Sequence, residues 1–208
     1  MARPRSFDEE RALDAAIDCF WSRGLETTSV RDLADHMGIQ GPSLYNAFGS
    51  KRALFARALE RYATRNMRER IARLERRHPP RAAIRAFLQE VIDRSVSDPH
   101  RRGCLLVNSA LEVAPHDKEL RARIAAYLGE IVAFFRRSIQ SAQAAGEVPQ
   151  KLDCDDTAKL LLGVLLGIRV LARANPDRAL LEGVARPALA LLDGSGPRAS
   201  PARRKARP

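Results

Sequence analysis

Apolar residues recur at intervals of three and four along most of the chain, the spacing that places them on one face of an α-helix. Proline and glycine fall at the ends of these periodic segments, and no segment alternates apolar and polar residues as a strand does. The pattern therefore predicts an all-α protein. Helices are expected at about 7–23, 30–37, 41–48, 50–77, 81–96, 103–113, 117–145, 154–174 and 177–193.

The second and third of these helices are short and joined by a tight turn, which is typical of a helix-turn-helix. Ser29 and Asp32 have the spacing of a capping box, and Gly38 is placed to end the second helix in the left-handed conformation. Pro42 and Gly49 frame the third helix in the usual order, proline near the start and glycine after the end. An N-terminal three-helix domain is expected from this arrangement.

The outer face of the third helix is polar and suited to the edges of DNA bases. Asn46 points outward, with Ser43 and Tyr45 beside it, and such side chains hydrogen-bond bases or phosphates. Lys51 adds a cation at the start of the next helix, where the helix dipole already attracts phosphate. A solvated helical hairpin in an ordinary domain would have a similar face. The predicted DNA-binding residues are Thr28, Ser29, Arg31, Gln40, Gly41, Ser43, Tyr45, Asn46 and Lys51.

Residues 16 to 55, from AIDCFWSRG through LYNAFGSKRALF, resemble the N-terminal domain of the TetR family of transcriptional regulators. The matching residues are Phe20, Gly24, Ser29, Tyr45, Phe48 and Lys51. The resemblance implies an all-helical homodimer that binds a palindromic operator in double-stranded DNA and releases it when a small molecule enters the C-terminal domain. Gln40 stands where the family often has a capping Ser or Thr, so the cap is weaker and Gln40 is free to read a base.

Three regions are expected: a DNA-binding domain at 1–52, a helical ligand-sensing and dimerisation domain at 53–193, and a basic, disordered tail at 194–208. The net charge of +11 favours a polyanionic partner. Residues 1–52 nevertheless hold seven basic and eight acidic side chains, so the net positive charge lies outside the predicted DNA-binding domain. Eight arginines between 57 and 77 predict a solvated basic face on a rigid helix that connects the two domains.

The three cysteines, Cys19, Cys104 and Cys154, are too few and too scattered for a disulfide framework, and with the four histidines they give no metal-ligand spacing. No metal or cofactor is expected. Cys104 lies at a predicted helix start behind Arg101 and Arg102, features that favour the thiolate. Some TetR-type regulators with a similar Gly-Cys-Leu segment respond to electrophiles or oxidants through this cysteine, and many do not. The alternative is a small apolar core residue.

An effector pocket, of unknown ligand, is expected between the helices of the second domain. The candidate lining residues are Tyr62, Phe87, Val91, Cys104, Asn108, Tyr127, Phe134 and Ile168, each of which fits an ordinary core equally well. The dimer interface is assigned to the helices at 154–174 and 177–193. Gly163 and Gly167 form a flat strip for a second copy, unless they allow close packing within one subunit.

Several classes of protein are excluded by pattern. The apolar run at 160–172 is too short to span a bilayer and contains Arg169, and the N-terminus lacks the features of a signal peptide, so a cytoplasmic protein without a membrane span is expected. The motifs of serine hydrolases, P-loop proteins, zinc proteases and dinucleotide-binding enzymes are absent, so an enzyme is not expected. A DNA-binding transcriptional regulator is predicted, acting as a repressor that a small-molecule or electrophile/oxidant signal releases from its operator. The alternative is an architectural nucleic-acid-binding protein without a sensor.

Overall fold

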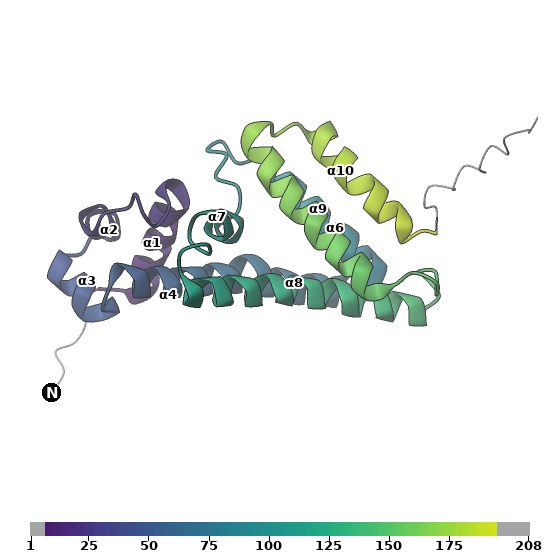
Figure 1. The fold of residues 1–208 in the computed structure, drawn as a ribbon, viewed down its shortest axis with the longest axis horizontal. Helices are drawn as coiled ribbons and strands as arrows, with labels where there is room; N and C mark the ends of the chain where they lie inside the picture. The colour runs from purple at the N-terminus through teal and green to yellow at the C-terminus, as the bar shows by residue number, and fades with distance from the viewer. Residues whose placement is uncertain (1–6, 195–208) are drawn as a thin grey trace, which may run out of the picture.

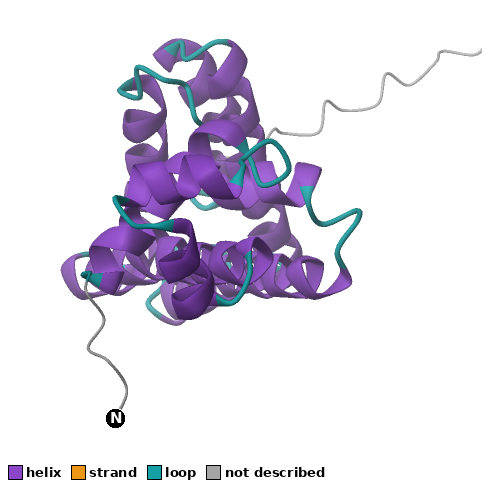
Figure 2. Cartoon of the chain, turned by 90° about the vertical axis from the view of Figure 1, so that its left-hand side faces the viewer, coloured by secondary structure: helices purple, strands orange, loops and turns teal. Residues whose placement is uncertain are grey.

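The computed structural model describes residues 7–194, and in this range the chain forms helices and loops without a strand (Figures 1 and 2). The elements are α1 (Glu9–Arg23), α2 (Val30–Met37), α3 (Gly41–Phe48), α4 (Lys51–Ala63), the π-turn η1 (Thr64–Arg68), α5 (Glu69–Arg77), α6 (Pro80–Val96), α7 (Leu105–Glu112), α8 (Lys118–Ala144), α9 (Cys154–Ala174) and α10 (Arg178–Leu191). The predicted all-α class is confirmed. The expected tail lies outside the described residues except for Gly194.

Helices α1 to α3 form a small head at one end of the molecule, packed on the first turns of α4 (Figure 1). Its core is anchored by Phe20 and Phe55, whose rings meet edge to face with centroids 5.0 Å apart. Leu33 from α2 and Leu44 from α3 are fully buried against this core. Aromatic and leucine burial of this kind fixes the angle between the two short helices, which are too short to be stable alone.

The remaining helices form the larger domain. The long helix α8 runs beside α4 and α5, while α6, α9 and α10 pack together across the other end (Figure 1). Phe87 of α6 meets Phe134 and Phe135 of α8, with ring centroids 5.4 and 5.5 Å apart. Helix α7 lies between the head and this domain, in contact with α1, α4, α8 and α9. No helix within residues 7–194 is long and apolar enough to cross a membrane.

The expected continuous helix at 50–77 contains a π-turn at Thr64–Arg68. Asn66 lies in this turn, and its side-chain amide donates to the carbonyl of Tyr62 at 3.3 Å. Asparagine favours such local bonds over a regular helix, and single π-turns are frequent at functional sites. The prediction of an uninterrupted helix is therefore wrong at this point.

Most of the arginines on this helix pair with carboxylates, and the expected solvated face is limited to the exposed Arg76 and Arg77 at its end. Arg61 binds Asp14 with two hydrogen bonds of 2.7 and 3.0 Å, and Arg68 binds Glu130 in the same way at 2.7 and 2.6 Å. Arg70 is buried. The partners come from α1 and α8, so this basic helix joins the head to the larger domain through paired charges, which local sequence could not indicate.

Candidate DNA interface and effector site

The third helix presents its polar face to solvent, as expected for a recognition helix. Tyr45 is 50% exposed, and Gln40 and Asn46 are also exposed, while Ser43 is half-buried. Gln40 occupies the N-cap position without a side-chain capping bond, so its amide is available to another partner. Gly41, the first residue of α3, is half-buried.

The start of α2 also faces solvent. Ser29 and Asp32 form the predicted capping box, in which the Ser29 hydroxyl accepts from the Asp32 amide at 3.0 Å and the Asp32 carboxylate accepts from the Ser29 amide at 3.0 Å. Hydrogen bonds from Ser29, together with Arg23, lower the pKa of Asp32 to about 2. Arg31 is exposed next to this cap, where a phosphate would meet it and the helix N-terminus together.

Two of the predicted DNA-binding side chains, the buried Thr28 and the half-buried Lys51, make hydrogen bonds within the protein. Thr28 is 1% exposed, and its hydroxyl donates to the carbonyl of Gly24. The ammonium of Lys51 donates to the carbonyls of Leu25 at 2.9 Å and Thr28 at 3.0 Å. These bonds fasten the loop between α1 and α2 to the start of α4. A phosphate contact by either side chain stays a prediction that this geometry does not support.

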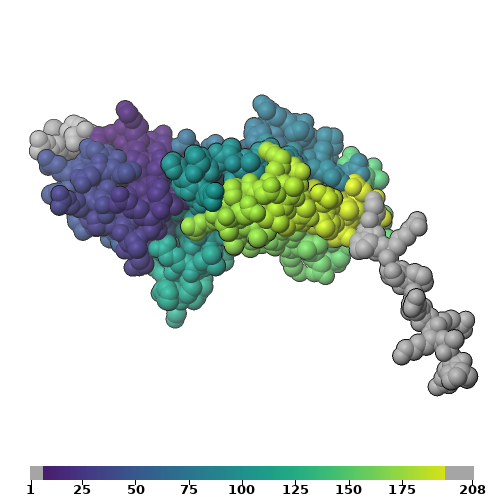
Figure 3. Space-filling model, turned by 90° about the horizontal axis from the view of Figure 1, so that it is seen from above, coloured from purple at the N-terminus to yellow at the C-terminus, as the bar shows by residue number. Residues whose placement is uncertain are grey.

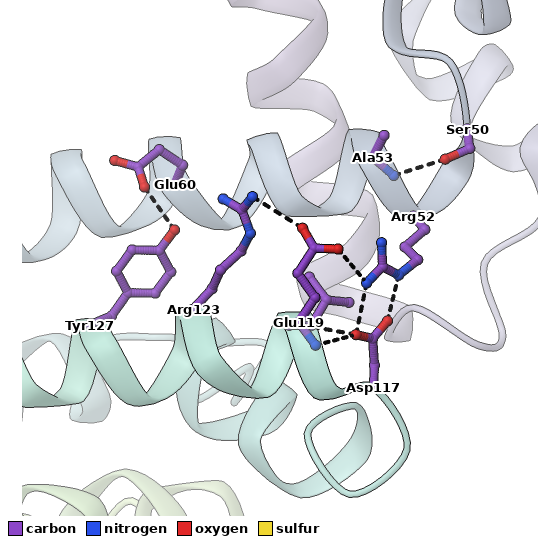
Figure 4. A network of polar contacts seen from close by, with 9 residues as sticks. Ser50, Arg52, Ala53, Glu60, Asp117, Glu119, Arg123 and Tyr127 are labelled. Carbon is purple, nitrogen blue, oxygen red and sulfur yellow. Dashed lines mark hydrogen bonds and ion pairs between the residues drawn. The ribbon is translucent and has the colours of Figure 1, made fainter.

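A charged network connects the start of α4 to the start of α8 (Figure 4). Arg52 donates to Asp117 at 2.8 Å and to Glu119 at 2.9 Å, and Arg52 holds the pKa of Asp117 well below its usual range. Further along, the hydroxyl of Tyr127 donates to Glu60 at 2.7 Å. The network fixes the head against the larger domain.

A second connection runs through α7 and the loop before it. The carboxylate of Glu112 accepts from the backbone amide of Glu26 at 3.0 Å. Arg102 stacks over the ring of Trp21, with its guanidinium carbon 4.2 Å from the ring centroid, and pairs with Asp18 at 3.2 Å. These contacts of Arg52, Arg102 and Glu112 cannot be read from the sequence, because their partners lie far away in the chain and no local signal marks them.

Four of the predicted effector residues line one inner cavity of about 40 Å³: Tyr62, Phe87, Val91 and Cys104. The hydroxyl of Tyr62 faces the thiol of Cys104, with oxygen and sulfur 3.7 Å apart, and accepts from the Leu105 amide at 3.4 Å. Burial raises the pKa of Tyr62, so this phenol stays protonated. The other predicted residues lie elsewhere: Asn108 against Arg102 and Arg173, Tyr127 against Glu60, and Phe134 and Ile168 in the core.

A much wider hollow, of about 950 Å³, is an open groove between the head and α8. Its arginines already have partners: Arg52 pairs with Asp117, Arg57 with Glu9, and Arg61 with Asp14. A surface of paired charges gives an effector little to bind, so the inner cavity is the better candidate despite its size.

The three cysteines differ in their surroundings. Burial raises the pKa of Cys19, and burial with the charges of Asp153 and Asp155 raises the pKa of Cys154. Cys104 is half-buried at the N-cap of α7. The guanidinium of Arg102 turns to Trp21. The structure therefore does not support the expectation that the Arg102 guanidinium lies beside the Cys104 thiol.

Comparisons with known proteins agree with this arrangement. The family model described as bacterial regulatory proteins of the tetR family matches residues 12–58, and the tetracyclin repressor-like C-terminal domain matches residues 80–188. An uncharacterised HTH-type transcriptional regulator of Bacillus subtilis (strain 168), YezE, is 32% identical over 195 residues, which span 93% of this chain and 100% of the relative. The chain belongs to the TetR family.

Other members of the TetR family are similar over most of their length. The HTH-type transcriptional repressor ComR of Escherichia coli (strain K12) is 29% identical over 194 residues, covering 91% of this chain and 90% of ComR. A cysteine mutant of the TetR family regulator CifR, solved with 26-bp operator DNA, is 36% identical with a TM-score of 0.80, covering 90% of this chain and 98% of CifR. The predicted resemblance is thus confirmed, and the chain is a transcriptional regulator of the TetR family.

Proposed function

We propose that the protein is a homodimeric repressor that binds a palindromic operator and is released by a small molecule or an electrophile. The observation that carries the proposal is the exposed polar face of α3, with Tyr45 and Asn46 free to reach base edges. CifR, the similar regulator, has been solved with operator DNA. Such a repressor acts in the cytoplasm, where its DNA lies, and needs no catalytic group.

A dimer follows from the size of one reading head and from the surface of α9. A single short helix is a small footprint for tight binding, and a twofold axis doubles it. Leu160 and Val170 are 45% and 48% exposed on α9, and Gly163 and Gly167 lie between them at helical spacing. A methyl group added at either glycine would meet no neighbouring helix within 4 Å, so close packing within one subunit does not account for them.

The release signal is carried from the inner cavity to the head through α7. Cys104 is the N-cap of α7 and faces Tyr62 of α4. Glu112 in the last turn of α7 holds the loop before α2 by accepting from the Glu26 amide. A group added to the Cys104 sulfur that is larger than the adjoining cavity of about 40 Å³ would displace the start of α7. Movement of α7 then shifts the head, which changes the distance between the two α3 helices of a dimer.

Selection of bound sequences from a random double-stranded DNA pool tests the proposal. We expect a palindrome whose half-sites are separated by about 34 Å or a multiple, because paired heads enter successive turns of the major groove. A variant with Tyr45→Ala and Asn46→Ala serves as the control and should enrich no sequence. Enrichment without a shared sequence by the wild type would favour the architectural alternative.

A further inference from the structure

The described residues contain three buried side-chain polar atoms without a hydrogen-bond partner, and all three are N–H donors. They are Nε1 of Trp21, Nε of Arg70 and Nε of Arg102. Arg70 lines the inner cavity, and Trp21 and Arg102 line an adjoining outer cleft of about 260 Å³. Tyr62, Asn66 and Arg169 line both, so the two hollows meet there. Buried donors without acceptors are costly and rare in native proteins.

Arginines outnumber carboxylates around this junction. Asp98 lines the outer cleft and already pairs with Arg102, whose Nε lies 3.6 Å from its carboxylate. Arg70 has a side chain only 4% exposed, and its nearest carboxylate, Glu90, is 3.6 Å from Nε. Glu90 is already held by Arg73 through two hydrogen bonds of 2.9 and 2.7 Å. Arg94 and Arg169 donate to the neutral Asn66 and Ser95, and neither pairs with a carboxylate within residues 7–194.

Burial, with repulsion from Arg94 and Arg169, lowers the pKa of Arg70 to about 10. The guanidinium is therefore still charged at neutral pH but destabilised by its surroundings. A buried cation of this kind lowers stability unless an anion pairs with it. The guanidinium carbon of Arg70 lies 5.7 Å from the centroid of the Phe87 ring, and this cation–π contact offsets part of the cost. Val91 and Leu165 on the same cavity wall are apolar and offer the guanidinium no hydrogen-bond acceptor.

We infer that the junction of the inner cavity and outer cleft binds a small organic acid, whose carboxylate lies against Arg70 and Arg169. The inference rests on the proposed effector-released function and names the chemical class of its ligand. A guanidinium binds a carboxylate with two parallel hydrogen bonds, and the unpaired N–H group of Trp21 accommodates a further oxygen atom. A cavity of about 40 Å³ has room for roughly three water-sized groups, so the apolar part of the acid is short.

The protein carries its own reporter of binding at this place. Trp21 is the one tryptophan in the chain, and its ring meets Tyr62 edge to face with centroids 5.2 Å apart. Butyrate and succinate are the probes, and butyramide is the neutral control of nearly the same shape. Each is titrated into the full-length protein at constant ionic strength without DNA, and the Trp21 fluorescence is followed.

We expect butyrate or succinate to bind at least about tenfold more tightly than butyramide, since a charge-assisted pair is worth more than a neutral bond. Arg70→Met and Arg169→Met should each weaken acid binding by about tenfold or more without affecting butyramide. Arg136→Met is the matched control, because Arg136 is exposed and pairs with Asp155 on another surface. It should leave both affinities unchanged.

Thermal unfolding separates ligand binding from a structural role. Arg70→Met should leave the melting temperature unchanged or raise it, because it removes a buried charge without a full partner. A lower melting temperature with unchanged acid binding would show that Arg70 only supports the fold, and Arg169→Met still tests the site if Arg70→Met fails to fold. Equal binding of acid and amide by the wild type would overturn the inference.

Operator binding is measured separately on the selected DNA. If the protein binds its operator but no acid, the proposed function holds and the inferred class of ligand is wrong. A protein that binds the acid but selects no DNA sequence lacks the proposed function. The two failures are therefore distinct.

Discussion

Among single residues, Asn46 offers the sharpest test of base reading, because it is exposed on α3 and the amide can pair with adenine through two hydrogen bonds. Asn46→Ala should cost about 1–3 kcal/mol on the selected operator and relax the preference at one position of each half-site. Binding to operator variants changed at each position measures this. Asn175→Ala, an exposed asparagine after α9, is the control. Equal loss on every sequence would contradict base reading by Asn46.

The sequence position of Lys51 indicates a phosphate contact, whereas in the structure its ammonium binds backbone carbonyls. Its ammonium donates to two carbonyls at 2.9 and 3.0 Å and lies 3.5 Å from a third, that of Glu26, so Lys51→Met leaves these acceptors without a charged donor. We expect the free energy of unfolding to fall by about 1–3 kcal/mol, measured by denaturant titration. An unchanged stability, with a salt dependence of DNA binding reduced by about one charge, would show that Lys51 acts mainly on phosphate.

These residues show which parts of the head the sequence could predict. The capping box of Ser29 and Asp32 depends on residues three apart, so its spacing is visible in the chain. The bond from Glu112 to the Glu26 amide joins residues that only the tertiary fold brings together. The unpaired donors of Arg70 and Trp21 were invisible for the same reason, since burial without a partner is a property of the packed core.

Among the elements, α7 connects the inner cavity to the head. Cys104 at its start and Glu112 at its end allow this connection to be tested. Alkylation of Cys104 should weaken operator binding in the wild type because the added group displaces the start of α7. Glu112→Ala removes the bond to the Glu26 amide at the other end, so alkylation should affect operator binding much less. Competitive alkylation with mass mapping and binding measured before and after treatment give the result.

Two controls limit the interpretation of that experiment. Glu69→Ala changes an exposed glutamate on α5 and should respond to alkylation like the wild type. Preferential labelling of Cys19 or Cys154, or full operator binding after Cys104 is blocked, would reject a sensor role for Cys104. The expected reactivity ranking agrees with the raised pKa of Cys19 and Cys154.

The helical segment at 50–77 shows a detail that apolar periodicity does not predict, the π-turn at Thr64–Arg68. Apolar spacing predicts a helix over 50–77 and gives its length correctly, yet a π-turn adds one residue to a turn without interrupting the apolar face. The carboxylate partners of its arginines come from α1, α6 and α8, which lie beside this segment only in the folded chain. Helix existence is a local property, whereas the partner of each charge is a global one.

For the whole molecule, the proposed dimer interface on α9 and α10 decides how many α3 helices reach the DNA. The surface of α9 and α10 lies open on the side seen in Figure 3, away from the head. Leu160 and Val170 of α9 are exposed, while Leu181 of α10 and Leu192 after it are buried in the chain's own core. The interface is therefore expected to centre on α9, with Leu180 at its edge, 38% exposed.

The double variant Leu160→Glu and Val170→Glu should convert a dimer into a monomer, because two like charges would face their copies across a twofold axis. Light scattering should give twice the chain mass of 23.1 kDa for the wild type and one chain mass for the variant. Leu111→Glu is the matched control, since Leu111 is 68% exposed on α7. The monomer should bind the palindrome far more weakly, having one reading head. A wild type that is monomeric at micromolar concentration yet binds the palindrome with full affinity would show that the two heads act without this interface.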